Sequence, residues 1–141
     1  MTRALGTFVA ALAICIAAAA SVTIAGQKAN GKDWTIPPKA ADERNPVTAS
    51  SSVLDKGQKV FQSKCQRCHG KDGGGRGPDA DPEHPAGNLG DKMRATFNPD
   101  GVMFYKIWNG RLDPKMPAFK TDGLEKDEVW SVIHFVKTFR K

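Results

Sequence analysis

The sequence predicts an all-helical domain that contains two long loops. No segment alternates apolar and polar residues for long enough to build a sheet. Segment 124–140 instead carries apolar residues at helical spacing, with acidic residues early and basic residues late. Segment 70–89 is dense in glycine and proline and lacks apolar bulk, and 111–123 is a second loop with prolines. These few helices can bury only a small hydrophobic core, so we expect a large apolar group to complete it.

The first 25 of the 141 residues have the pattern of an export signal. Arg3 precedes an apolar run from Leu5 to Ala20, which ends in small residues suited to cleavage. The alternative is an uncleaved membrane anchor, because residues 4–25 are long enough to cross a bilayer. Cys15 lies within this segment and would leave with it. The pattern favours cleavage and a periplasmic protein, which would be membrane-bound only if the segment is retained.

Residues 26–52 are polar, contain three prolines and show no helical or strand periodicity. We interpret them as a tether or as an extended arm that lies on the domain. Trp34 and Ile36 are its candidate anchor points, although an exposed linker tryptophan is an equally good interpretation. The domain itself is expected to span residues 53–141.

Helices are expected in four places along this domain. The first covers 53–68 and is opened by Ser51 and Ser52, and a short helical turn follows at 90–97. The third covers 98–110, with Asn98 as its cap, Pro99 at the first position and Gly110 as its stop. The fourth is the terminal helix within 124–140.

The charge of the chain is moderately positive. Its formal net charge is +6, and loss of Arg3 with the signal leaves +5. This charge suits docking to an acidic protein face or an anionic surface. No interleaved pattern of aromatic and basic residues is present, so we expect no nucleic-acid partner.

The segment "KCQRCHGKDGGGRG", residues 64–77, places Cys65, Cys68 and His69 next to a run of glycines. Four chemistries use such residues: a covalent haem, a zinc site, a redox dithiol and a disulfide. Zinc is disfavoured because adjacent side chains at 68 and 69 do not easily reach one tetrahedral ion. A dithiol would need a βαβ setting, and a disulfide within so short a loop would stabilise little. Haem attachment uses all three residues at once.

Together, "CQRCHG", the glycine-rich loop and "KMPAF" before the terminal helix resemble class I c-type cytochromes, the small monohaem electron carriers of bacterial periplasms. The resemblance covers residues 53–141. It implies a cytochrome c fold of about three to five helices around one covalently bound haem c, with the first and last helices crossing. Cys65 and Cys68 would attach the haem and His69 would bind its iron. Gly57, Phe61 and Trp130 match the positions where the two helices cross.

Met116 is the expected second iron ligand. The family places its ligand in a "MP" loop before the last helix, and Pro117 restricts the backbone beside this sulfur. Met93 lies in another segment, and Met103 falls inside a helix, where methionine usually fills a core. His134 also falls among core residues and is a weaker candidate.

A ligating histidine normally donates its other ring proton to a carbonyl. The family takes this carbonyl from a proline in the loop after the motif. Pro78, Pro82 and Pro85 are the candidates here, and "PAGNL" resembles the family segment best, which favours Pro85. The loop is longer than the family pattern.

The resemblance implies an electron carrier without substrate chemistry of its own, reduced by one redox protein and oxidised by another. A haem-bearing subunit of a membrane or periplasmic oxidoreductase complex is the alternative, with the arm as its attachment. A third possibility is a haem that binds gases or peroxide. A ring of basic side chains around the haem would favour redox partners with acidic faces. The alternative is that these side chains are ordinary solvated surface. They are Lys64, Arg67, Lys71, Arg76, Lys115 and Lys120.

Overall fold

The computed structural model describes residues 34–113 and 115–140. The predicted export signal and the first part of the arm, residues 26–33, lie outside these ranges. Within them the chain forms helices and no strand, which confirms the all-α prediction. The elements in order are α1 Pro38–Asp42, α2 Ser51–Val60, the π-helical turn η1 Phe61–Cys65, α3 Gln66–His69, α4 Lys92–Thr96, α5 Asp100–Asn109 and α6 Lys126–Lys137. None of these helices has the length and apolar character needed to cross a membrane.

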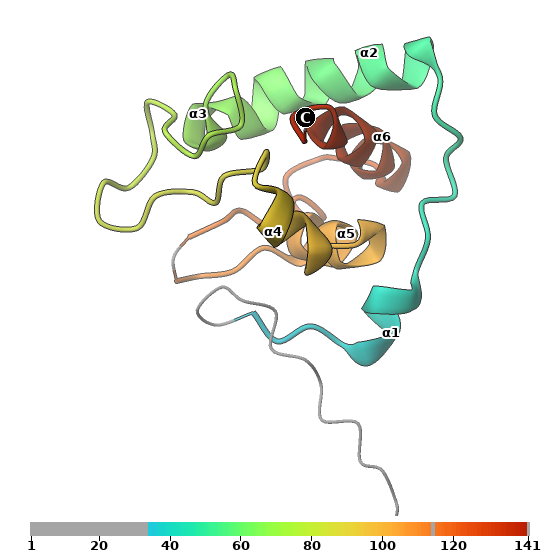
Figure 1. The fold of residues 1–141 in the computed structure, drawn as a ribbon, viewed down its shortest axis with the longest axis horizontal. Coiled ribbons are helices and arrows are strands. Elements are labelled where there is room, and N and C mark those ends of the chain that lie inside the picture. The colour runs from blue at the N-terminus through green and yellow to red at the C-terminus, as the bar shows by residue number, and fades with distance from the viewer. Residues whose placement is uncertain (1–33, 114, 141) are drawn as a thin grey trace, which may run out of the picture.

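Helices α2 and α6 cross each other and form the centre of the fold (Figure 1). Their backbones meet at Gly57, where an added Cβ would lie 2.2 Å from the carbonyl oxygen of Ser131. Phe61, only 1 % exposed, packs beside this crossing against Phe135 and Phe139, with ring centroids 5.4 and 5.2 Å away. Gly57 and Phe61 thus lie where the family resemblance placed them. Trp130, the third predicted position, precedes Ser131 in α6 and stacks on Phe104 of α5.

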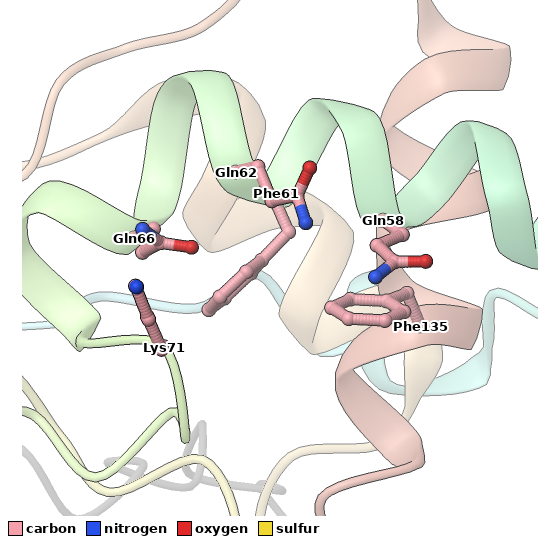
Figure 2. Close-up of a pocket in the computed structure, with 6 residues that line it drawn as sticks. All are labelled: Gln58, Phe61, Gln62, Gln66, Lys71 and Phe135. Carbon is pink, nitrogen blue, oxygen red and sulfur yellow. The ribbon is translucent and has the colours of Figure 1, made fainter.

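A hollow of about 440 Å³ lies beside this junction. Figure 2 shows the Phe61 ring pointing from the α2–η1 helix into the space between Lys71 and Phe135, which projects from α6. Glutamine side chains and one lysine complete its wall: Gln58, Gln62, Gln66 and Lys71. Neither the two thiols nor His69 nor Met116 lines it. The hollow is therefore separate from the residues predicted to hold a haem.

The structure caps α2 and α5 close to the positions expected from the sequence, and each N-cap lies one residue away from the expected one. The Ser50 hydroxyl accepts from the Val53 amide and caps α2, one residue before the expected pair. Helix α5 begins at Asp100 with Pro99 as its N-cap, so the expected Asn98 cap is one residue too early. Asn98 instead bonds the Arg94 carbonyl and Lys106. Gly110 ends α5 as expected, with a φ of 60°.

The helix before the cysteines is not uniform. The sequence predicts one continuous helix over 53–68, whereas the structure has the π-helical turn η1 between α2 and α3. A π turn holds one residue more than an α-helical turn, and such turns are frequent at functional sites. Lys64, within this turn, pairs with Asp122 at 3.0 Å.

Candidate functional site

The three motif residues lie on one short helical segment, which the glycine-rich loop holds at its C-terminal end. Helix α3 contributes four carbonyls that have no partner within a helix. Amide groups of the loop bond all four, at 2.8 to 3.0 Å. The pairs are Gly70 with Gln66, Asp79 with Arg67, Gly77 with Cys68 and Gly75 with His69. The loop thus fixes the orientation of the segment that carries the motif.

Two of the loop glycines are required by close approach. A Cβ at Gly77 would lie 2.3 Å from the Arg67 carbonyl oxygen, and one at Gly75 would lie 1.9 Å from that of Ala86. Gly75 also has a φ of 85°, which other residues rarely adopt. Asp79 pairs with the Arg67 guanidinium and so ties the loop to α3 a second time. The glycines therefore let the loop lie directly on the helix end.

Cys65 and Cys68 are free thiols and partly buried. Burial, and then the neighbouring Cys68, raises the pKa of the Cys65 thiol to about 12. A redox dithiol needs a thiol with a lowered pKa, because the thiolate is the reactive form. Among the described residues, no three His, Cys, Asp or Glu side chains gather as a metal cluster, which disfavours zinc. Two free thiols beside an imidazole fit covalent haem attachment.

His69 is held by a single backbone carbonyl. Its Nδ1 lies 3.2 Å from the carbonyl oxygen of Gly87, which can only accept, so Nδ1–H donates. The other ring nitrogen, Nε2, therefore keeps its lone pair. Burial lowers the pKa of His69, opposed by this hydrogen bond, and the ring stays neutral at pH 7, as metal binding requires.

The partner of His69 corrects the expectation of Pro85. The expected segment, "PAGNL", supplies the carbonyl, but from Gly87, two residues later. Pro85 is exposed. The segment is held by the Leu89 amide, which donates to the Gly73 carbonyl at 2.8 Å, and the nearby Gly87 carbonyl lies within hydrogen-bond distance of Nδ1 of His69. Residue type alone does not reveal which carbonyl accepts this hydrogen bond, since every residue has a carbonyl.

The candidate second ligands differ in their surroundings. Met93 is 69 % exposed on α4, and Met103 is buried in α5 at 7 %. His134 donates from Nε2 to the carbonyl of Val47 at 2.7 Å, so this ring nitrogen already has a hydrogen-bond partner. Met116 lies in the loop between α5 and α6, partly buried. This loop and the loop after α3 lie on the same side of the helices in Figure 1.

The predicted cationic ring is partly neutralised by the domain itself. Lys64 pairs with Asp122, Arg67 with Asp79 and Arg76 with Asp72. Lys120 bonds the Asn109 side chain. Lys71 and Lys115 are exposed and make no ion pair with any described residue. Lys120 bonds a neutral amide and keeps its charge, so Lys71, Lys115 and Lys120 are the ring members whose positive charge has no anionic partner among the described residues.

Comparison with known families agrees with this chemistry. Residues 52–136 match a family described as "Cytochrome C oxidase, cbb3-type, subunit III", a c-type cytochrome domain. The chain belongs to this family. No curated protein sequence matches the chain. This cytochrome therefore binds a c-type haem covalently, Cys65 and Cys68 fit its CxxCH motif, and its domain serves haem-based electron transfer.

Proposed function

We propose that this cytochrome carries single electrons through one haem c whose iron is bound by Nε2 of His69 and Sδ of Met116. Cys65 and Cys68 form the two thioether links to the porphyrin. The observation that carries the proposal is the hydrogen bond from His69 to Gly87, because it frees one defined ring nitrogen for the iron. The bound haem supplies an iron that gains and loses one electron.

Each of these residues has a distinct role in that proposal. The carbonyl of Gly87 fixes the tilt of the imidazole and raises its basicity as a ligand. A thioether from Met116 would be the second protein ligand of the iron, and this ligand set suits electron transfer rather than binding of gases or peroxide. The loop amides on α3 hold the two thiols and the imidazole on one rigid segment. Little movement is then needed when the iron changes its charge.

The proposal includes export to the periplasm and shuttling between redox proteins with acidic faces. Covalent c-type haem, the apolar leader and the net positive charge support both parts. A mass spectrum of the exported protein tests them together with attachment. The expected mass is that of residues from about 21 or 26 onward plus one haem. A mass that includes residues 1–25 would contradict cleavage.

A second candidate is a haem-bearing subunit of an oxidoreductase complex. The family description, which names a subunit of a cytochrome oxidase, favours it. Affinity purification from detergent extract separates the two. A stoichiometric partner would support the subunit, whereas a freely soluble monomer would support the carrier.

The ligand assignment is tested by Met116→Ala. Ferric haem with a methionine ligand has a sulfur-to-iron absorption band in the near red, and we expect this variant to lose it. Met93→Ala is the matched control and should keep the band, because Met93 is exposed on α4. If Met116→Ala keeps the band, another residue must be the second iron ligand.

A further inference from the structure

The segment before the haem-binding domain packs on that domain. We call residues 34–50 the N-terminal arm; they lie outside the residues that match the family. Trp34, Ile36 and Ala40 are each no more than 9 % exposed and form, with Val102 of α5, an arm cluster separate from the main core. A Cβ at Gly101 would lie 2.1 Å from the Ala40 carbonyl oxygen, so the arm backbone rests directly on α5. Figure 1 shows α1 beside α5.

The other end of the N-terminal arm is fixed to α6. The side-chain amide of Asn45 donates to the Trp130 carbonyl at 2.9 Å. The Val47 carbonyl accepts from His134 at 2.7 Å, and its amide donates to the Asn45 side chain. The arm is thus held at two separate places. It does not simply trail from the domain.

Met116 is the side chain that joins the arm cluster to the main core. Among the described residues that pack partly buried against a core, it alone touches both. Its backbone exchanges two hydrogen bonds of 2.9 Å with Arg111. The Arg111 guanidinium carbon in turn lies 4.9 Å from the centroid of the Trp34 ring, and Lys106 lies 5.4 Å from it. Trp34 therefore faces the bridge that holds Met116.

We propose that the N-terminal arm braces the methionine loop, with Trp34 as the positioning residue. This inference rests on the proposed ligation of iron by Met116. Movement of the loop away from the iron would separate Arg111 from the Trp34 ring and expose the apolar face that Met116 shares with the arm cluster. Loss of both a cation–π contact and apolar burial opposes that opening. The arm thereby lowers the population of an open axial position.

Imidazole binding to the ferric haem protein measures that population, because imidazole enters only when the methionine has left. Trp34→Ala should bind imidazole about tenfold more tightly than the unaltered protein, since the open state becomes more populated. Trp34→Phe keeps an aromatic face and should restore most of the difference. If Trp34→Ala yields too little holoprotein, Trp34→Leu should shift the affinity in the same direction.

The matched control is Asn45→Ala, which removes one of the two hydrogen bonds between the arm and α6 but leaves the contacts near Met116 in place. It should be less stable toward denaturant, with unchanged imidazole affinity. Equal imidazole affinity in Trp34→Ala and the unaltered protein would overturn the proposal. An equal shift in Asn45→Ala would also overturn it, because the effect would then be general destabilisation.

Met116→Ala separates the two proposals. If it keeps the near-red band and the imidazole affinity of the unaltered protein, the ligand assignment fails, and the brace fails with it. If it loses the band while Trp34→Ala binds imidazole normally, only the brace is wrong. The near-red band of Trp34→Ala itself should persist in the absence of imidazole, because the methionine remains bound in most molecules.

Discussion

Gly57 lies against the backbone of Ser131, with only 2.2 Å between the place of a Cβ and the Ser131 carbonyl oxygen. Alanine normally stabilises a helix interior relative to glycine by about 0.5 to 1 kcal/mol. Gly57→Ala should instead lower the free energy of unfolding by about 1 to 3 kcal/mol, because α2 and α6 must separate. Denaturant titration of the haem protein measures this. Gln58→Ala, at the next and exposed position, should change little; equal effects at both would contradict the contact.

The glycine-rich loop on α3 offers a second test variant with a matched control variant. A methyl group at Gly77 would collide with the Arg67 carbonyl, whereas one at Gly74 meets only the movable side chains of Asp72 and Arg76. Gly77→Ala should lower the free energy of unfolding by about 1 to 3 kcal/mol and speed hydrogen exchange at the amides of residues 75–79. Gly74→Ala should leave these exchange rates nearly unchanged. Protection retained in Gly77→Ala would argue against the capping role.

The corrected carbonyl partner of His69 is testable in the ferric protein. Pro85→Ala should leave the redox potential and the NMR shift of the His69 ring proton unchanged, because Gly87 supplies the acceptor. Deletion of Ala86 moves the following carbonyls by one place and should shift both quantities. A large shift in Pro85→Ala alone would restore the proline as the partner.

The free energy of unfolding should depend on pH through the ionisation of Lys106. Burial, and then Arg111 and Arg94, lowers the pKa of Lys106 from 10.5 to about 8. The folded state therefore binds this proton less tightly than the unfolded state, and the charged lysine destabilises the fold below pH 8. That destabilisation fades as the pH rises from about 8 to 10.5. The full shift corresponds to about 3 kcal/mol, and solvent screening reduces it to about 1 to 2.

Lys106→Met should accordingly be more stable than the unaltered protein below pH 8, and the difference should vanish near pH 10.5. Denaturant titrations across this range measure it, and Lys39→Met, at an exposed position of α1, serves as the control. A difference that is absent at pH 7 would mean that an anionic group compensates Lys106 in the haem protein.

Lys71 and Lys115, two of the exposed ring lysines without ion pairs, should contribute strongly to docking on acidic surfaces. Replacing Lys71 and Lys115 with glutamate should weaken adsorption to a carboxylate-terminated electrode by about tenfold at low ionic strength. The difference should shrink in high salt, because screening suppresses it. The same exchange at Lys39 and Lys59 alters the net charge equally and should have a smaller effect. Equal effects would assign docking to total charge rather than to this surface.

The parts of the site that depend on side-chain chemistry could be predicted from the sequence. Cys65, Cys68 and His69 form a contiguous motif, and helix-compatible patterning located α5 and α6 to within two residues at their starts. The close contact of α2 with α6 could be placed at Gly57 because a family pattern marks that position.

The parts that depend on backbone geometry could not be predicted. The carbonyl partner of His69 is set by how the loop folds onto α3, and Gly87 has no feature that distinguishes its carbonyl from that of Pro85. The sequence does not indicate whether Trp34 is buried, because a polar segment with prolines gives no periodicity from which to infer contacts. The π turn, which contacts α6, has no sequence pattern of its own.

The π turn sets the side of the molecule on which the thiols lie. Successive residues of an α-helix are rotated by about 100°. If residues 61–65 took regular α-helical geometry at unchanged length, the residue that the π turn absorbs would swing Cys68 and His69 by roughly that angle relative to α6. A chain regularised in this way would keep its CxxCH letters intact and yet present them to the wrong side of the molecule.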